Sequence, residues 1–140
     1  MIFTEAEREY LATQSLGRLA SIGPGGGRQV NPVTYWVNVG TETIEVGGPG
    51  LGGSQKFRNI QADPRISFVV DDVATEPVGP GGQRGRGLEV RGRAEVLAVD
   101  RPLMEGFCRE VIRIHPRRVI AWNVDGPGKN ARNVTRNPAN

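Results

Sequence analysis

The stretch LEVRGRAEVLAV (88–99) alternates apolar and polar side chains more regularly than any other part of the chain. A strand with one apolar and one polar face is typical of an antiparallel sheet that covers a core on one side only. The stretch therefore predicts a long strand of such a sheet. The apolar positions are Leu88, Val90, Ala94, Val96 and Ala98, and the polar positions are Glu89, Arg91, Arg93 and Glu95.

Five further segments have the composition of strands, and their spacing is typical of hairpins. The glycine-rich turn GPGGG (23–27) separates the first two of them, which predicts a hairpin. Because no βα unit repeats, we expect a mainly β fold with short helices, namely an antiparallel six-stranded, barrel-like sheet. The five segments are residues 18–22, 29–39, 41–46, 65–72 and 117–124.

Two short helices are predicted from capping and spacing. In residues 4–15, Thr4 and Glu7 form the pattern of a capping box, in which each side chain accepts from the backbone of the other. The second helix follows a glycine-rich loop, where Phe57 and Ile60 stand three positions apart and can be buried together.

A third helix and a mobile loop are also expected. Asp100 has the character of an N-cap, Pro102 suits a first turn, and the helix is predicted to run through LMEGFCREVIR (103–113) with Cys108 in its apolar phase. Residues 73–87 are rich in Gly and Pro and are read as a mobile loop.

The size and composition of the chain exclude several classes of protein. With 140 residues, of which 37% are hydrophobic, one domain with a buried core is expected. Sixteen of the eighteen basic residues are Arg, and the net charge of +3 is dispersed, which disfavours a nucleic-acid-binding protein. No apolar run reaches the roughly 18 residues of a membrane span, and a signal-peptide pattern is missing, so a cytoplasmic protein is expected.

The residues that bind metals or act in acid–base catalysis are few. Cys108 is the single cysteine and His115 the single histidine, which excludes an internal disulfide and disfavours a conventional zinc site. The pair Asp71–Asp72 has no third ligand nearby, so no metal site is predicted. His115, in a His-Pro pair, is more typical of a turn or cap than of a general acid, and no catalytic residue is assigned.

The loop VGGPGLGGSQKFRNI (46–60) allows several interpretations. Gly48, Gly50 and Gly53 have the spacing of a dinucleotide-binding fingerprint, but the antiparallel-looking neighbours disfavour a Rossmann unit. The phosphate loop of nucleotide hydrolases does not fit, because Ser-Gln-Lys follows Gly53. A flexible turn and an anion cradle remain; in the cradle, Ser54, Lys56 and Arg58 supply donors at the start of a helix.

Four segments together resemble one known family. GGSQKFRNIQADPRISFVVDD (52–72) resembles the corresponding part of the pyridoxamine-5′-phosphate-oxidase-like (PPOX) split-barrel family, in its F420-dependent (deazaflavin) oxidoreductase branch. The resemblance covers about residues 5–125, so 1–125 is expected to be the cofactor-binding domain and 126–140 a polar, partly disordered tail. The other three segments are LGRLASIGPGGGRQVNPVTYWV (16–37), LEVRGRAEVL (88–97) and REVIRIHPRRVIAWNVD (109–125).

The resemblance implies an FMN-binding-like split β-barrel that forms a homodimer, with each cofactor in a cleft between the subunits. It implies that the loop–helix segment cradles the cofactor phosphate and that the second strand carries the ring. Pro32 agrees with this placement, because a proline leaves part of a strand edge without a donor. The implied residues are Gly48, Ser54, Lys56 and Asn59 for the phosphate, and Asn31, Pro32, Val33, Thr34 and Tyr35 for the ring. Phe57, of the same loop–helix segment, is also included as a cofactor-binding residue.

Several basic residues and one tryptophan have open roles. Arg91 or Arg93 could stabilise charge on a substrate, although a solvated strand face is the simpler interpretation. Trp122 is included as a cofactor-stacking residue, and a core or interface position is equally open. Arg84 and Arg86, together with Lys56 and Arg58, could meet an acidic cofactor tail, with surface solvation as the alternative.

The resemblance implies an oxidoreductase that binds coenzyme F420 and transfers a hydride from its reduced form to a small conjugated organic molecule. One alternative is an FMN-dependent enzyme of the same fold. Another is a non-catalytic protein that binds a cofactor or a tetrapyrrole, since a fold does not determine a function.

Overall fold

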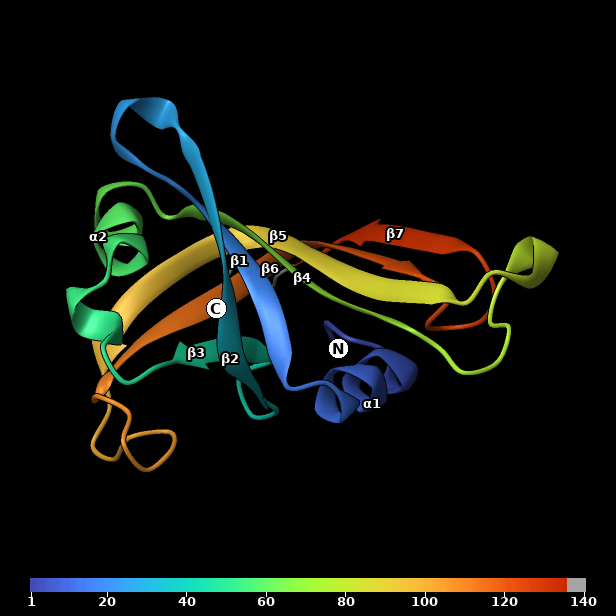
Figure 1. Ribbon diagram of the computed structural model, residues 1–140, viewed down its shortest axis with the longest axis horizontal. Helices are drawn as coiled ribbons and strands as arrows, with labels where there is room; N and C mark the ends of the chain where they lie inside the picture. The colour runs from blue at the N-terminus through green and yellow to red at the C-terminus, as the bar shows by residue number, and fades with distance from the viewer. Residues whose placement is uncertain (136–140) are drawn as a thin grey trace.

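The strands of the protein form one sheet that closes on itself (Figure 1). The computed structural model describes residues 1–135. Two α-helices accompany the sheet, α1 (Glu5–Thr13) and α2 (Gln55–Ala62), with short 3-10 turns at Pro24–Gly26, Leu51–Gly53 and Pro80–Gly82. The strands are β1 (Leu16–Ile22), β2 (Arg28–Asn38), β3 (Thr43–Gly47), β4 (Arg65–Val73), β5 (Gly85–Ala98), β6 (Glu110–Trp122) and β7 (Lys129–Asn133).

The order of the strands is β3-β2-β1-β4-β5-β6-β7, and every pairing is antiparallel. An additional pairing between β3 and β6 closes the first six strands into a barrel. The predicted six-stranded antiparallel barrel is therefore confirmed, with β7 as a further strand outside the closed ring.

Strands β5 and β6 are the longest and pair from Gly87–Trp122 to Ala98–Glu110. Along its other edge, β6 pairs with β3 at Ile112–Ile114 and with β7 at Arg118–Trp122. One end of the long pair thus belongs to the barrel, and the other end, with β7, extends away from it (Figure 1).

Apolar side chains of all six barrel strands fill the interior. The predicted inward faces are confirmed at Phe68 and Val70 of β4 and at Leu88 and Val90 of β5, all of which are buried. Helix α2 covers part of the core with Phe57 and Ile60, as their spacing predicted. The fully buried apolar side chains include Phe3, Leu11, Leu19, Ile44, Val46, Ile112, Ile114 and Val119.

The helix predicted for residues 100–113 is absent from the structure. Residues 99–109 form turns, with Gly106 at φ 86°, and the chain enters β6 at Glu110. Val111 and Ile112 are completely buried in the sheet. Burial of these two β-branched residues against the barrel core favours a strand and outweighs the helix signals of Asp100 and Pro102. Consequently, Cys108 lies in a turn and not on a helix.

The predicted strand at 117–124 begins earlier, because β6 continues through His115 and Pro116. The register with β5 shifts between Arg91 and Gly92, so Arg117 is the extra residue of a β-bulge. A bulge accommodates a proline that could not donate to a regular ladder. A Cβ on Gly92 would lie 2.2 Å from the backbone oxygen of His115, so only glycine fits opposite the bulge.

Two segments expected to lack regular structure are partly ordered by pairing. Within 73–87, the end of β4 and the start of β5 form a hairpin that encloses the turn Pro80–Gly82. Within the polar tail, Lys129–Asn133 form β7 on the free edge of β6, which supplies backbone partners that the sequence pattern does not reveal. The remainder of the predicted disordered tail, 136–140, lies outside the described residues.

Helix α1 is joined to β7 by a buried ion pair. The capping box is confirmed: the Thr4 hydroxyl accepts from the backbone N–H of Glu7, and the Glu7 carboxylate accepts from that of Thr4. The same carboxylate is fully buried and accepts two hydrogen bonds from Arg132, one of them from Nη1 at 2.9 Å.

Among residues 1–135, no helix has the length and apolar character of a membrane span.

Replacing Arg132 by Met should lower the free energy of unfolding by about 3 kcal/mol, because the buried Glu7 carboxylate loses its counter-charge. Adding Glu7→Gln should restore part of that loss, since no charge then remains buried. Arg91→Met is the matched control, because Arg91 pairs with Glu89 on an exposed face, and it should change the stability by less than about 1 kcal/mol. Urea unfolding measures the stability of R132M, of the double variant with E7Q and of R91M. Equal losses of stability in R132M and R91M would contradict a stabilising role of the buried Glu7–Arg132 pair.

Gly92→Ala should destabilise the fold by about 1 to 3 kcal/mol, because the new methyl group meets a backbone oxygen that the bulge holds in place. Gly27→Ala is the control: no heavy atom lies within 4 Å of its Cβ position, and its φ of −65° suits alanine. The midpoint of urea unfolding distinguishes the two variants. A Gly92→Ala protein as stable as Gly27→Ala would show that the backbone of the bulge can move to accommodate the methyl group at little cost in stability.

Candidate functional site

A hollow of about 360 Å³ lies at the glycine-rich loop, and we call it the glycine-loop hollow. It brings together strand β2, the loop after β3, the start of α2 and the turn before β6. Six of the residues that the family resemblance implied are on its wall: Pro32, Val33, Thr34, Gly48, Ser54 and Lys56. The other lining residues are Gly47, Pro49, Gly50, Leu51, Met104 and Phe107.

The loop is shaped by its own hydrogen bonds and by the cap of α2. The backbone N–H groups of Gly53 and Ser54 donate to the carbonyls of Gly50 and Leu51. The Ser54 hydroxyl donates to Leu51 O at 2.6 Å and accepts from the N–H of Phe57 at 3.3 Å. Ser54 is therefore the N-cap of α2, and its proton is already committed to the loop.

Lys56 is the charged group of this hollow. It lies in the first turn of α2, is half-buried, and has no hydrogen-bond or ion-pair partner among residues 1–135. The first N–H groups of a helix lack intrahelical acceptors and carry a partial positive charge. A cation and a helix N-terminus at one wall suit a phosphate group. Arg58, by contrast, donates to Gly53 O and to Gln55, and it does not line the hollow.

The turn before β6 forms another wall of the glycine-loop hollow. Cys108 donates to the carbonyl of Gly48 twice, from its backbone N–H at 3.2 Å and from its thiol at 3.3 Å. A Cβ on Gly47 would lie 3.0 Å from the ring of Phe107, so the turn packs closely on the strand. Met104 and Phe107 thereby join the site. Sequence reasoning missed them because it placed both on a helix, and no motif around them signals a binding role.

Three of the implied residues are committed to the interior instead. Phe57 is buried in the core. Asn59 is buried and donates to the Ser21 hydroxyl and to Gln29, so it joins α2 to the β1–β2 hairpin. Tyr35 points into the barrel, where its ring meets Phe68 edge-on at 5.3 Å.

Two other implied residues do not line the glycine-loop hollow. Asn31 is exposed on β2, opposite Leu19 of β1. Trp122 is at the far end of β6, where it pairs with Gly87 of β5 and with Lys129 of β7. Within one subunit, Trp122 thus belongs to the extension and not to this site.

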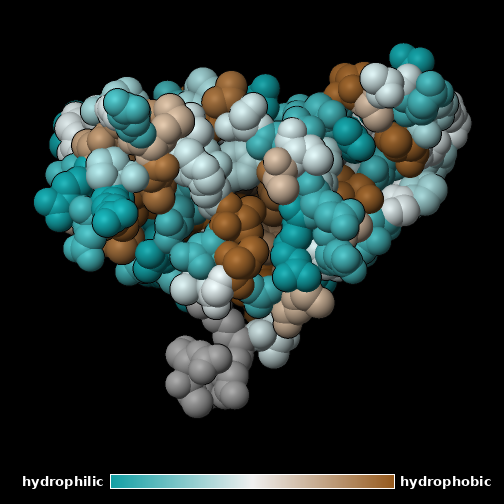
Figure 2. Space-filling view, turned by 90° about the horizontal axis from the view of Figure 1, so that it is seen from below, coloured by the Kyte–Doolittle hydropathy of each residue, from teal (hydrophilic) through white to brown (hydrophobic). Residues whose placement is uncertain are grey.

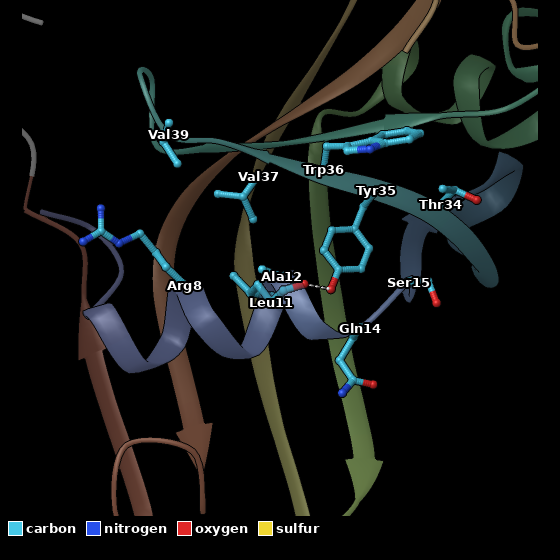
Figure 3. A pocket seen from close by; sticks show the side chains of 10 residues that line it. All are labelled: Arg8, Leu11, Ala12, Gln14, Ser15, Thr34, Tyr35, Trp36, Val37 and Val39. Carbon is cyan, nitrogen blue, oxygen red and sulfur yellow. Dashed lines mark hydrogen bonds between the residues drawn. The ribbon is translucent and has the colours of Figure 1, made fainter. Parts of the chain in front are cut away.

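A second pocket, of about 470 Å³, lies between α1 and β2, and we call it the α1–β2 pocket (Figure 3). Figure 2 shows apolar side chains gathered around a hollow on this face of the molecule. Its lining residues are Arg8, Leu11, Ala12, Gln14, Ser15, Thr34, Tyr35, Trp36, Val37 and Val39.

Tyr35 connects the two elements that enclose the α1–β2 pocket. Its hydroxyl donates to the carbonyl of Leu11 at 2.6 Å, close to the end of α1. Burial raises the pKa of Tyr35 to about 12, so the phenol is neutral and remains a donor at physiological pH.

The two hollows are neighbours along β2. Thr34 lines both of them. Trp36 of the α1–β2 pocket and Phe107 of the glycine-loop hollow are in edge-to-face contact, with ring centroids 6.0 Å apart. A molecule in one hollow therefore lies close to a molecule in the other.

The remaining candidate residues form ion pairs away from both hollows. His115 is within a strand and not at a turn, and its Nε2 lies 2.9 Å from Glu95. Asp72 accepts from Arg86 and from the Tyr10 hydroxyl, and the Arg86 hydrogen bond lowers the pKa of Asp72.

The candidate residues Asp71, Arg84, Arg91 and Arg93 also lie outside both hollows. Asp71 pairs with Arg18, and Arg91 pairs with Glu89. Arg84 and Arg93 are exposed. Among residues 1–135, no three potential metal-ligating side chains lie together.

Known proteins resemble this chain over almost its whole length. The model of the pyridoxamine 5′-phosphate oxidase family matches residues 3–137. A 5a,11a-dehydrotetracycline/5a,11a-dehydrooxytetracycline reductase from Streptomyces rimosus is 37% identical over 139 residues, which cover 96% of this chain and 95% of that protein.

Solved structures share the fold. A protein described as an F420 reductase has a TM-score of 0.55 and 26% identity, and the match covers 75% of this chain and 88% of that chain. A heme-binding protein from Mycobacterium smegmatis has a TM-score of 0.66 at 19% identity, covering 92% of this chain and 57% of that chain. An FAD-binding protein from the same organism has a TM-score of 0.61 at 15% identity, covering 96% and 99%. The match of the family model to nearly the whole sequence shows that the chain belongs to the pyridoxamine 5′-phosphate oxidase family.

Proposed function

We propose that this protein is a reductase that binds coenzyme F420 and reduces a conjugated organic molecule. The observation that carries the proposal is Lys56, a half-buried cation without a described partner at the start of α2 and on the wall of the glycine-loop hollow. The identity of 37% to a tetracycline-type reductase supports the reaction class. The F420 reductase of similar fold supports the choice of cofactor.

The residues of the glycine-loop hollow fit a phosphate-bearing cofactor. Lys56 would neutralise part of the phosphate charge, and the first turn of α2 would add backbone donors. No heavy atom lies within 4 Å of a Cβ position on Gly50, which lines the hollow, so the loop leaves open space for a ligand there. Pro32 and Thr34 would border the ring system, as the family resemblance implies.

The chain's contribution to the reaction is placement and exclusion of water. When bound, the reduced cofactor supplies a hydride. Met104 and Phe107 would cover the bound molecule on the side of the turn before β6. Because, among residues 1–135, Lys56 is the one titratable side chain that lines the glycine-loop hollow, we assign no acid or base to the chain there. We retain the homodimer, with sites completed between subunits, as part of the proposal.

A carrier of heme is less well supported than a reductase. The similarity to the heme-binding protein of Mycobacterium smegmatis is at 19% identity and concerns the fold alone. The chain has a single histidine, His115, and its ring is paired with Glu95 outside both hollows. A histidine-ligated heme would have to break that pair.

Titration of the purified protein with coenzyme F420 and, separately, with FMN tests the choice of cofactor. We expect micromolar binding of F420, followed by its fluorescence, and much weaker binding of FMN. Single-turnover oxidation of reduced F420 by a conjugated enone then tests for a reductase. Micromolar FMN binding without a response to F420 would reverse the assignment, and F420 binding without turnover would favour a carrier.

Lys56→Ala should weaken F420 binding by about 1 to 3 kcal/mol if the ammonium group contacts the phosphate. Lys129→Ala is the matched control, because Lys129 is the only other lysine of the chain and is exposed on β7. It should leave the Kd unchanged. Fluorescence titration of both variants measures the difference. An unchanged Kd in Lys56→Ala would show that the loop is a turn without a role in phosphate binding.

A further inference from the structure

The α1–β2 pocket combines apolar walls with one charged group. Leu11, Val37 and Trp36 provide apolar and aromatic surface, and Arg8 is the charged residue of the lining. Arg8 is half-buried and, among residues 1–135, its guanidinium has no carboxylate within salt-bridge distance. Figure 3 shows it rising from α1 toward Val39 at one end of the pocket. A ligand for this pocket is therefore largely apolar and carries a negative charge near one end.

The walls of this pocket are held in place before any ligand binds. The Tyr35 hydroxyl fixes the end of α1 to β2, and the Glu7–Arg132 pair fixes the start of α1 to β7. The volume of about 470 Å³ is in the range of small-molecule sites. A preformed, aromatic-lined pocket suits a planar ligand, because neither partner loses much conformational freedom on binding.

The hydroxyl groups at the other end of the pocket point to a polar contact next to the cofactor. Ser15 and Thr34 have hydroxyls without a hydrogen-bond partner among the described residues. Thr34 also lines the glycine-loop hollow. A carbonyl oxygen placed at Thr34 would thus lie between the two hollows, where an acceptor must meet a cofactor.

We infer that the α1–β2 pocket binds the substrate of the reductase, and that this substrate is a planar conjugated molecule whose anionic oxygen pairs with Arg8. That the bound molecule is a substrate rests on the proposed function. The binding chemistry of the pocket, a planar anion held by Arg8 against aromatic walls, is independent of the cofactor.

Two fluorescent probes test that chemistry without any cofactor. Anilinonaphthalene sulfonate is aromatic and anionic, and phenylnaphthylamine is the same scaffold without the sulfonate. Arg8→Gln should weaken binding of the sulfonate probe about tenfold and leave the neutral probe within about twofold. Arg117→Gln, an exposed arginine on β6, should affect neither probe. Equal losses for both probes, or no loss for the sulfonate, would overturn the inference.

A second variant tests the location of the bound probe. Ala12 is an exposed residue of α1 that lines the pocket, so Ala12→Trp fills the pocket from the helix surface without altering the core. Binding of both probes should fall at least tenfold. Unchanged probe binding in a protein of normal unfolding midpoint would place the ligand elsewhere. A change of particle mass in light scattering would instead assign this face to a second copy of the chain, which would overturn the inference.

Turnover connects the pocket with the proposed function. With an anionic conjugated enone, Arg8→Gln should raise KM about tenfold while the Kd for F420 stays unchanged. If the unmodified protein did not bind F420, the proposed function would be contradicted. The probe experiment would still decide the chemistry of the pocket. An unchanged KM together with intact F420 binding would contradict the pocket assignment and leave the reductase in place.

Discussion

The shared edge of β6 is the constraint on which the rest of the architecture depends. Its first half pairs with β3 and closes the barrel, and its second half pairs with β7 outside the barrel. Closure gives each of the six ring strands a hydrogen-bonded neighbour on both sides over part of its length. The bulge at Arg117 separates the two halves, and Gly92 is the residue of β5 that allows the close approach.

Barrel closure also builds the candidate site. The pairing of β3 with the start of β6 brings the turn at 103–108 onto the loop after β3, where Cys108 is bonded to Gly48. The glycine-loop hollow lies on one side of this arrangement, and β2 forms part of its wall. Helix α1, fixed through Tyr35 and Arg132, bounds the second pocket on the same strand. Two ligand-sized hollows thus meet at Thr34.

Most predictions based on neighbouring residues agree with the structure, and the helix predicted for residues 100–113 is the exception. The capping box of α1, the cap of α2 and the alternating faces of β4 and β5 each depend on residues a few positions apart. Asp100 and Pro102 gave a local helix signal as well, but Val111 and Ile112 gain more from burial in the sheet. Likewise β7, with its polar composition, is stabilised by backbone pairing with β6, which no local pattern indicates. Asn59 and Tyr35 lie in the predicted segments, yet their polar groups bond across the fold and not toward the hollow.

The sequence by itself determined the antiparallel strands with their hairpin spacing, the helices α1 and α2 and the cationic loop around Lys56, because each depends on the spacing of apolar, capping or charged residues along the chain. Only the tertiary structure decided that Met104 and Phe107 join the glycine loop and that Trp122 lies far from it. It also decided that Arg8 lies beside an apolar pocket with no carboxylate partner within residues 1–135. These facts depend on which segments meet when β3 pairs with β6 and α1 docks on β7. Contacts between residues far apart in the chain follow from closure of the barrel, and closure is a property of the whole sheet.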